Sequence, residues 1–175
     1  MNYLKIGLIV LFLSTLSHGY TQKEQWLIDY TNQYRSQWIN KELSDVTLWN
    51  VDGEKITKDQ LKKGVTVFNF WFTTCKPCIV ELPALNSIAS NPEFKEVSFI
   101  GSTFDTEEQI LKFVKKRPFK YKLVSSEEFT KRTMSVKVFP THLVIKDGVI
   151  MDLIIGYEED IEKTLSEMIK SAIAK

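Results

Sequence analysis

The feature that most constrains this chain is a strand of buried type that leads directly into a cysteine pair. Residues 65–72 read Val-Thr-Val-Phe-Asn-Phe-Trp-Phe, and such a β-branched and aromatic run is typical of a central strand covered on both faces. Shortly after it, Cys75-Lys76-Pro77-Cys78 opens a segment whose apolar spacing is helical to about Ser90. The chain has only these two cysteines, so chemistry is expected at this strand-to-helix junction.

The remaining pattern predicts an α/β fold with a mixed sheet. Strands alternate with helices, which calls for parallel crossovers, while Asp147-Gly148 between two apolar runs is a hairpin signal that forces an antiparallel pair. The expected strands are 97–102, 121–124, 141–145 and 149–155, and the expected helices are 76–90, 106–116, 126–133 and 158–174. Before the central strand we expect a β-hairpin, from 43–48 and a piece around 55–56, and a short helical turn from Thr57 to Gly64. Helices should flank both faces of the central sheet.

The N-terminus reads as a targeting segment followed by a helical extension. Residues 1–19 combine a short basic start, an apolar run and small residues, which predicts a cleavable secretory signal, or a membrane tether if it stays uncleaved. Residues 20–42 form the predicted extension, and 43–175 the main domain. In the extension, aromatic residues every four positions form a stripe that either packs on the protein or meets a partner or membrane. The stripe consists of Trp26, Tyr30, Tyr34 and Trp38.

Composition and charge exclude several classes of function. The chain is 43% hydrophobic and 26% charged, an ordinary globular balance for one domain. Its formal charge of +1 falls to zero without residues 1–19, because Lys5 is the single charged residue among them. Acidic and basic residues are interspersed, so we expect no nucleic-acid partner. We expect a monomer in the periplasm or cell envelope.

The placement of the cysteines predicts thiol-disulfide exchange. A helix N-terminus leaves N–H groups unpaired and carries partial positive charge, both of which favour a thiolate at Cys75. Lys76 adds a nearby cation, and Pro77 suits the first helical turn. Cys75 is therefore the expected nucleophile, and Cys78 the residue that resolves the mixed disulfide. The Cys75–Cys78 disulfide would be the redox centre, with no cofactor and no metal.

Other readings of the cysteine pair remain open at this stage. A purely structural disulfide closes too short a loop to stabilise the chain much. A zinc site lacks ligands, because beyond the pair the mature chain offers only His142. A Cu(I)-binding module using Cys75, Cys78 and His142 is an alternative function. A peroxidase is weaker, since peroxidase-like sites have threonine where this chain has Phe72.

Two motifs occur together: residues 68–83 around the cysteine pair, and residues 136–141, which read Val-Lys-Val-Phe-Pro-Thr before a strand, an Asp-Gly turn and a strand. Together they resemble the TlpA-like, cytochrome c maturation type branch of the thioredoxin superfamily, over about residues 43–175. The resemblance implies a thioredoxin fold, a cis peptide bond at Pro140 facing the dithiol, and a proton-transfer role for Glu81. It implies substrate contacts at Trp71, Thr74, Lys76, Pro77, Phe139 and Pro140.

The resemblance also implies a function. It predicts a reductase of disulfides in exported proteins, with apocytochrome c or another oxidoreductase as substrate and a membrane thiol donor as its own reductant. A disulfide oxidase or isomerase would use the same residues. Two departures from the family pattern, Thr74 in place of tryptophan and Val138 in place of glycine, alter the surface near Cys75 and leave substrate preference open.

Overall fold

The structure, a computed structural model, describes residues 21–175, which fall into two compact units divided between Tyr34 and Arg35. The predicted signal segment, 1–19, lies outside the described residues. The first unit holds most of helix α1 (Gln22–Trp38). Along it the ring of Tyr30 lies 5.5 Å from that of Trp26 and 5.5 Å from that of Tyr34, which confirms this part of the aromatic stripe. Within the described residues, no helix is both long and apolar enough to cross a membrane.

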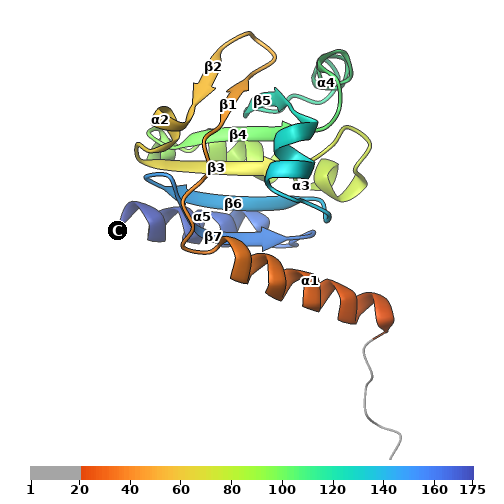
Figure 1. Cartoon of the computed structure of the whole chain (residues 1–175). Coiled ribbons are helices and arrows are strands. Elements are labelled where there is room, and N and C mark those ends of the chain that lie inside the picture. The colour runs from red at the N-terminus through yellow and green to blue at the C-terminus, as the bar shows by residue number, and fades with distance from the viewer. Residues whose placement is uncertain (1–20) are drawn as a thin grey trace, which may run out of the picture. The chain divides into compact units, whose positions relative to one another are not determined.

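The second unit is built on a five-stranded sheet in the order β5-β4-β3-β6-β7 (Figure 1). Its strands are β3 (Val65–Phe70), β4 (Ser98–Thr103), β5 (Lys122–Ser125), β6 (Thr141–Lys146) and β7 (Val149–Ile155). The central strand β3 pairs in parallel with β4 and antiparallel with β6. The predicted turn joins β6 to β7, with positive φ angles at Asp147 and Gly148. The expected mixed sheet is confirmed.

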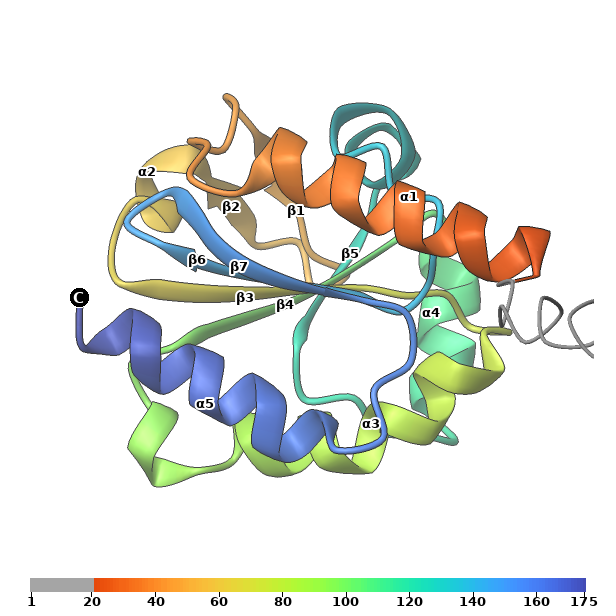
Figure 2. The ribbon, with the colours of Figure 1, turned by 90° about the horizontal axis from the view of Figure 1, so that it is seen from below.

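Helices cover both faces of this sheet. Helices α3 (Lys76–Ala89) and α5 (Ile161–Ile173) lie side by side on one face (Figure 2). Val65 and Val67 point to that face and share a buried cluster with Leu85 and Leu165. Because side chains alternate along a strand, Phe68 and Phe70 point the other way, where both rings contact Phe129. Every residue of β3 is buried, as expected for a central strand.

Phe129 belongs to an element that the sequence describes only in part. The segment 126–133 was expected to be a helix, and the Ser126 hydroxyl accepts a hydrogen bond from the Phe129 N–H. The observed element, η2 (Glu128–Thr133), is a π-helical turn, in which the Met134 N–H donates to the Phe129 carbonyl. A spacing pattern in the sequence does not separate this wider turn from an α-helix.

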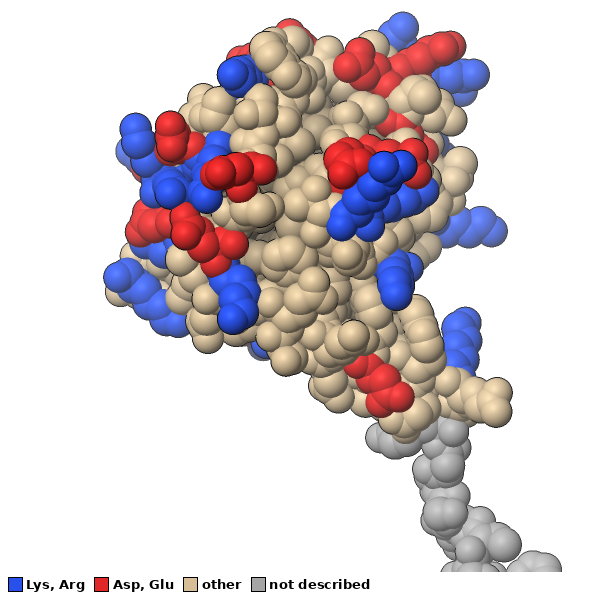
Figure 3. All heavy atoms as spheres, in the orientation of Figure 1, with Lys and Arg blue, Asp and Glu red and all other residues tan. Residues whose placement is uncertain are grey.

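The smaller elements complete the unit. Strands β1 (Thr47–Trp49) and β2 (Lys55–Thr57) form a separate antiparallel hairpin, so the predicted hairpin is confirmed, although its first strand starts later than expected. Helix α2 (Lys58–Leu61) follows it, with Thr57 as its N-cap. Helix α4 (Glu107–Val114) and the short 3-10 helix η1 (Pro92–Phe94) complete the described elements. On the face shown in Figure 3, acidic and basic side chains are intermixed, as the sequence indicated.

Candidate active site

The two cysteines lie at the N-terminus of α3 and are joined by a disulfide. The sulfur–sulfur distance is 1.95 Å and the Cα atoms are 5.3 Å apart. Cys75 is the N-cap of α3, and its sulfur accepts a hydrogen bond of 3.2 Å from the Cys78 N–H. The helix therefore directs a backbone donor and the positive end of its dipole at the Cys75 sulfur, the arrangement that favours a thiolate after reduction.

The surroundings of the pair differ in exposure. Thr74, Lys76 and Pro77 are exposed and flank Cys75, so the structure places these three predicted contact residues on the accessible rim. The cysteines themselves are buried, with 4% of Cys75 and 2% of Cys78 exposed. In the disulfide form the expected difference in access between the two cysteines is thus small.

An acidic residue that the sequence analysis did not identify supports the loop before Cys75. The Asp105 carboxylate accepts a hydrogen bond from the Thr73 N–H, and the Asp105 N–H donates to the Thr103 hydroxyl. Asp105 follows β4, which runs parallel to β3, and the carboxyl ends of parallel neighbours meet at one edge of a sheet. The position of Asp105 shortly after a strand that runs parallel to β3 could have identified it from the sequence.

The peptide bond between Phe139 and Pro140 is cis, as the resemblance implied. The loop that carries it is held on both sides, because the Thr141 hydroxyl donates to the Val138 carbonyl and the Gly156 N–H donates to the Pro140 carbonyl. Thr141 pairs with Phe70 at the end of β3. This register brings the proline loop beside the segment that leads to Cys75.

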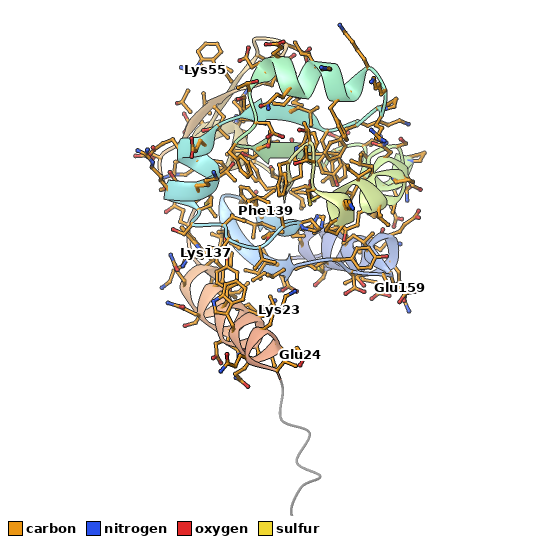
Figure 4. The ribbon with its side chains drawn as sticks, turned by 90° about the vertical axis from the view of Figure 1, so that its right-hand side faces the viewer. Lys23, Glu24, Lys55, Lys137, Phe139 and Glu159 are labelled. Atoms are coloured by element: carbon orange, nitrogen blue, oxygen red, sulfur yellow. A yellow bond between two sulfur atoms is a disulfide. The ribbon has the colours of Figure 1, made fainter. Side chains whose placement is uncertain are left out.

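Three half-buried phenylalanines form an aromatic cluster between these loops. The Phe72 ring lies 5.2 Å from that of Phe104 and 5.3 Å from that of Phe139, and the last two are 5.6 Å apart. Phe139 precedes β6 (Figure 4). The Lys131 ammonium lies 3.9 Å from the centre of the Phe104 ring, a cation–π contact. Phe104 and Lys131 were not identified from the sequence, and the packed ring of Phe72 leaves no hydroxyl at the position where a peroxidase-like site has threonine.

Trp71 is a core residue and not part of the accessible surface. Only 1% of it is exposed, and its ring packs against Phe113 at 5.2 Å and Phe119 at 5.4 Å. A side chain at Gly101 would come within 3.1 Å of the indole nitrogen, so the small residue on β4 gives the indole its space. The expectation that Trp71 contacts substrate is therefore corrected.

Behind the disulfide lies a buried polar chain that joins three elements. Glu81 is on α3, one turn after Cys78, and is only 2% exposed. One of its oxygens lies 2.9 Å from His142 Nε2 on β6, and the other accepts a hydrogen bond of 3.0 Å from the Glu158 N–H. His142 Nδ1 lies 3.2 Å from the side-chain amide of Asn69 on β3. Glu81 was predicted as a site residue, but its contact with His142, and the contact of His142 with Asn69, were not predicted.

Tyr121 also lies near this chain. Burial raises the pKa of its phenol well above the usual range, and the nearby Glu81 carboxylate raises that pKa further. The phenol therefore stays protonated and neutral at physiological pH.

His142, the third ligand of the Cu(I) alternative, is engaged by other side chains in the disulfide form. Both ring nitrogens of His142 face other side chains, Asn69 and Glu81. No group of three or more histidine, cysteine or acidic residues within 21–175 is arranged to hold a metal ion.

A strand-to-helix dithiol beside a cis-proline loop, on a mixed sheet flanked by helices, defines a thiol-disulfide oxidoreductase of the thioredoxin class. The chain belongs to the AhpC/TSA family, whose family model matches residues 39–152. This assignment is consistent with the resemblance to TlpA-like proteins.

Named relatives agree with the assignment. The chain is 32% identical over 159 residues to the thiol-disulfide oxidoreductase ResA of one Bacillus cereus strain, covering 89% of each chain. It is 33% identical over 174 residues to ResA of a second Bacillus cereus strain, covering 97% of this chain and 96% of that one.

Solved structures show the same fold. A thiol:disulfide interchange protein of the thioredoxin family from Chlorobium tepidum matches with a TM-score of 0.66 at 19% identity, covering 77% of this chain and 97% of that one. A secreted Mycobacterium tuberculosis disulfide oxidoreductase matches with a TM-score of 0.62 at 18% identity, covering 72% and 95%.

Proposed function

We propose that this protein reduces disulfides in exported proteins, with Cys75 as nucleophile and Cys78 as resolving thiol. One observation carries the proposal: the Cys75 sulfur lies at the N-terminus of α3, bonded to Cys78 one turn further along. The Cys75 thiolate attacks one sulfur of the substrate disulfide and expels the other as a thiolate. Cys78 then loses its proton, attacks Cys75 and releases the second substrate thiolate. Two electrons pass from the dithiol to the substrate.

In this mechanism Glu81 takes the proton from Cys78. Both residues are buried on one face of α3, and an (i, i+3) pair of side chains on a helix is within contact distance. A thiol enclosed by protein ionises slowly unless a base is near, so a carboxylate beside Cys78 speeds the resolving step. When the protein is reduced again, the same carboxyl returns the proton.

The accessible rim and the aromatic cluster form the proposed substrate surface. Thr74, Lys76 and Pro77 flank Cys75, and the ring of Phe139, which precedes the buried Pro140, lies 5.3 Å from that of Phe72. Half-buried aromatic rings offer apolar area at low cost in side-chain entropy. An extended polypeptide with an apolar side chain next to its cysteine suits this surface.

The direction of electron flow and the location of the protein belong to the same proposal. The Mycobacterium tuberculosis relative that is described as secreted supports export, with residues 1–19 as the signal, or as a tether if it stays uncleaved. We propose a monomer that acts on apocytochrome c or another exported oxidoreductase, and that a membrane thiol donor keeps reduced. A reductant of this kind has a reduction potential near or below that of thioredoxin, about −270 mV, whereas a potential near −120 mV belongs to an oxidant.

The direct test traps the substrates. A Cys78→Ser chain expressed in the native host retains the nucleophile but cannot resolve the mixed disulfide, so substrate proteins stay bonded to Cys75. We expect discrete adducts that are released by dithiothreitol and absent from a matched Cys75→Ser chain. Equal adducts on both variants, or none on either, would contradict the proposal. The potential of the wild-type pair, measured against a glutathione or dithiothreitol buffer, decides the direction.

A further inference from the structure

We propose that His142 is a positioning residue that lets Glu81 hold the proton of Cys78, so that Asn69, His142 and Glu81 form a buried proton store for the dithiol. The inference rests on the proposed function and deepens it. Its basis is that the three side chains come from β3, β6 and α3 and are 1%, 0% and 2% exposed.

The hydrogen bonds define where the protons are in the oxidised protein. In the orientation that the structure gives the Asn69 amide, its NH₂ faces His142 Nδ1, and the tautomer that accepts this hydrogen bond carries its proton on Nε2 and donates it to Glu81. The other Glu81 oxygen accepts the Glu158 N–H. Glu81 is thus a carboxylate held by two donors, which offset part of the cost of burying its charge.

A proton that arrives from Cys78 can be accommodated without breaking this chain. If the Asn69 amide turns over, its carbonyl oxygen faces His142 Nδ1, and the tautomer with its proton on Nδ1 donates a hydrogen bond to that oxygen. The unprotonated Nε2 then faces Glu81, so the proton that Glu81 takes from the Cys78 thiol can pass on to Nε2. The imidazole becomes an imidazolium that donates Nε2–H to the Glu81 carboxylate, and Cys78 is left as the thiolate that attacks Cys75. Uptake of the proton changes the group from one buried negative charge to an ion pair with no net charge. Burying an ion pair costs less free energy than burying a single unpaired charge. Glu81 is the group that meets Cys78, and His142 acts through it.

Other groups near the store do not compete for the proton. Tyr121, ahead of β5, is a neutral phenol whose pKa is raised by burial and by the Glu81 charge. Glu158, ahead of α5, faces Glu81 with its backbone N–H, and its side chain accepts a hydrogen bond from the Asp160 N–H. Across β6, the residue paired with His142 on β7 is the apolar Ile154.

The experiment separates the two sulfur steps. Reduced protein is mixed with the aromatic disulfide 5,5′-dithiobis(2-nitrobenzoate) in a stopped-flow instrument between pH 6 and pH 10. The first coloured thiolate is released when Cys75 attacks, and the second when Cys78 resolves the mixed disulfide. His142→Gln keeps an N–H that can donate to Glu81 but cannot take up a proton. His142→Asn is the second variant should the first not fold.

We expect His142→Gln to leave the first phase unchanged and to slow the second by about tenfold or more at pH 7, since a positioned base contributes roughly 10²–10⁴-fold. The loss should shrink above about pH 9, where hydroxide ionises the thiol unaided. Glu81→Gln should behave alike, and the double variant should be no slower than Glu81→Gln alone, because the two residues act as one unit.

The control is Thr130→Val, which removes a buried hydrogen bond to Ser102 and should leave both phases unchanged. The proton store would be overturned if His142→Gln left the rate of the second phase unchanged, or lowered it by the same factor at every pH. It would also be overturned if Thr130→Val slowed the second phase as much as His142→Gln does. Failure of the proposed function looks different: the wild-type protein itself would then show no rapid first phase.

Discussion

Three residues on one face of α3 carry the proposed chemistry, each placed by its position on the helix. Cys75 is at the N-terminus, where the helix stabilises negative charge, while Cys78 and Glu81 follow at successive turns and are each 2% exposed. The accessible end of the helix therefore suits attack, and the buried side suits proton transfer.

The aromatic cluster leads to a prediction about substrate size. Phe104→Ala removes one ring of the cluster and the contact with Lys131, but no atom of the dithiol. We expect reduction of insulin to slow by about three- to tenfold, equivalent to roughly 1 kcal/mol of lost apolar contact. Reaction with a small aromatic disulfide should stay within twofold of wild type.

Leu111→Ala, at an exposed residue of α4, is the matched control and should change neither rate. Equal loss for the protein and the small disulfide would show that Phe104 supports the fold of the site and not the binding of polypeptide.

Site residues whose partners are close in the sequence were predicted, whereas those whose partners are distant in the sequence were missed. Cys75 and Cys78 were identified because one helical turn relates them, and Glu81, one turn further on, was identified through the family resemblance. His142 joins Glu81 across 61 positions and Asn69 across 73, and no local pattern encodes such a contact. His142 was considered as a metal ligand; the register of β3 and β6 pairs it with Asn69, and the packing of α3 on the sheet brings it to Glu81.

Among the elements, the short π-helical turn η2 packs the ring of Phe129 on one face of the sheet. Phe129 is 2% exposed and contacts Phe68 and Phe70. Phe129→Ala should lower the free energy of unfolding by about 3–5 kcal/mol, the usual cost of emptying a large aromatic site in a core. Urea denaturation of the oxidised protein measures it.

Phe129→Leu fills most of the space and should cost clearly less than Phe129→Ala. If the two substitutions had the same small effect, η2 would not contribute to the core as the structure shows.

Ion pairs join the segment before β1 to α2 and the residue that follows it, which predicts a pH dependence. Lys62 and Lys58 lower the pKa of Glu42 below its usual 4.5, and Lys58 lowers that of Asp45 below 3.8. A carboxyl whose folded-state pKa is lowered stabilises the protein above its unfolded pKa, and this contribution is lost as the pH falls through the folded value. Lys58→Met should therefore lower the urea midpoint slightly at pH 7, and the difference should close below about pH 3.

All four side chains are at the surface, so the same difference should also shrink in about 1 M salt. A difference that persisted at low pH and high salt would mean that the Lys58 side chain acts through packing instead of charge.

The order of elements was predictable because their signals are local. The β-branched and aromatic run of β3, the Asp-Gly turn between β6 and β7 and the Thr106 cap of α4 each lie within a few residues. The π-helical geometry of η2 and the late start of β1 were not predictable, because both depend on packing. Trp71 was misplaced for the same reason: the space provided by Gly101 belongs to the neighbouring strand.

For the whole molecule, the proposed direction of electron flow is linked to stability. If the folded protein is a stronger reductant than its unfolded chain, folding must favour the disulfide form over the dithiol form. We therefore expect the oxidised protein to unfold at a higher urea concentration than the reduced protein. The reduced samples are not alkylated and are kept in dithiothreitol during the measurement. A more stable reduced form would indicate an oxidant.

The most direct test of the dithiol is a count of free thiols across a series of dithiothreitol redox buffers, by rapid alkylation and intact-mass measurement. We predict that molecules carry either no alkyl group or two, that the ratio follows a two-electron equilibrium, and that the Cys75→Ser chain keeps one alkyl group throughout. Accumulation of singly alkylated wild-type protein, or a pair that stays oxidised at every accessible ratio, would contradict a reversible Cys75–Cys78 redox centre.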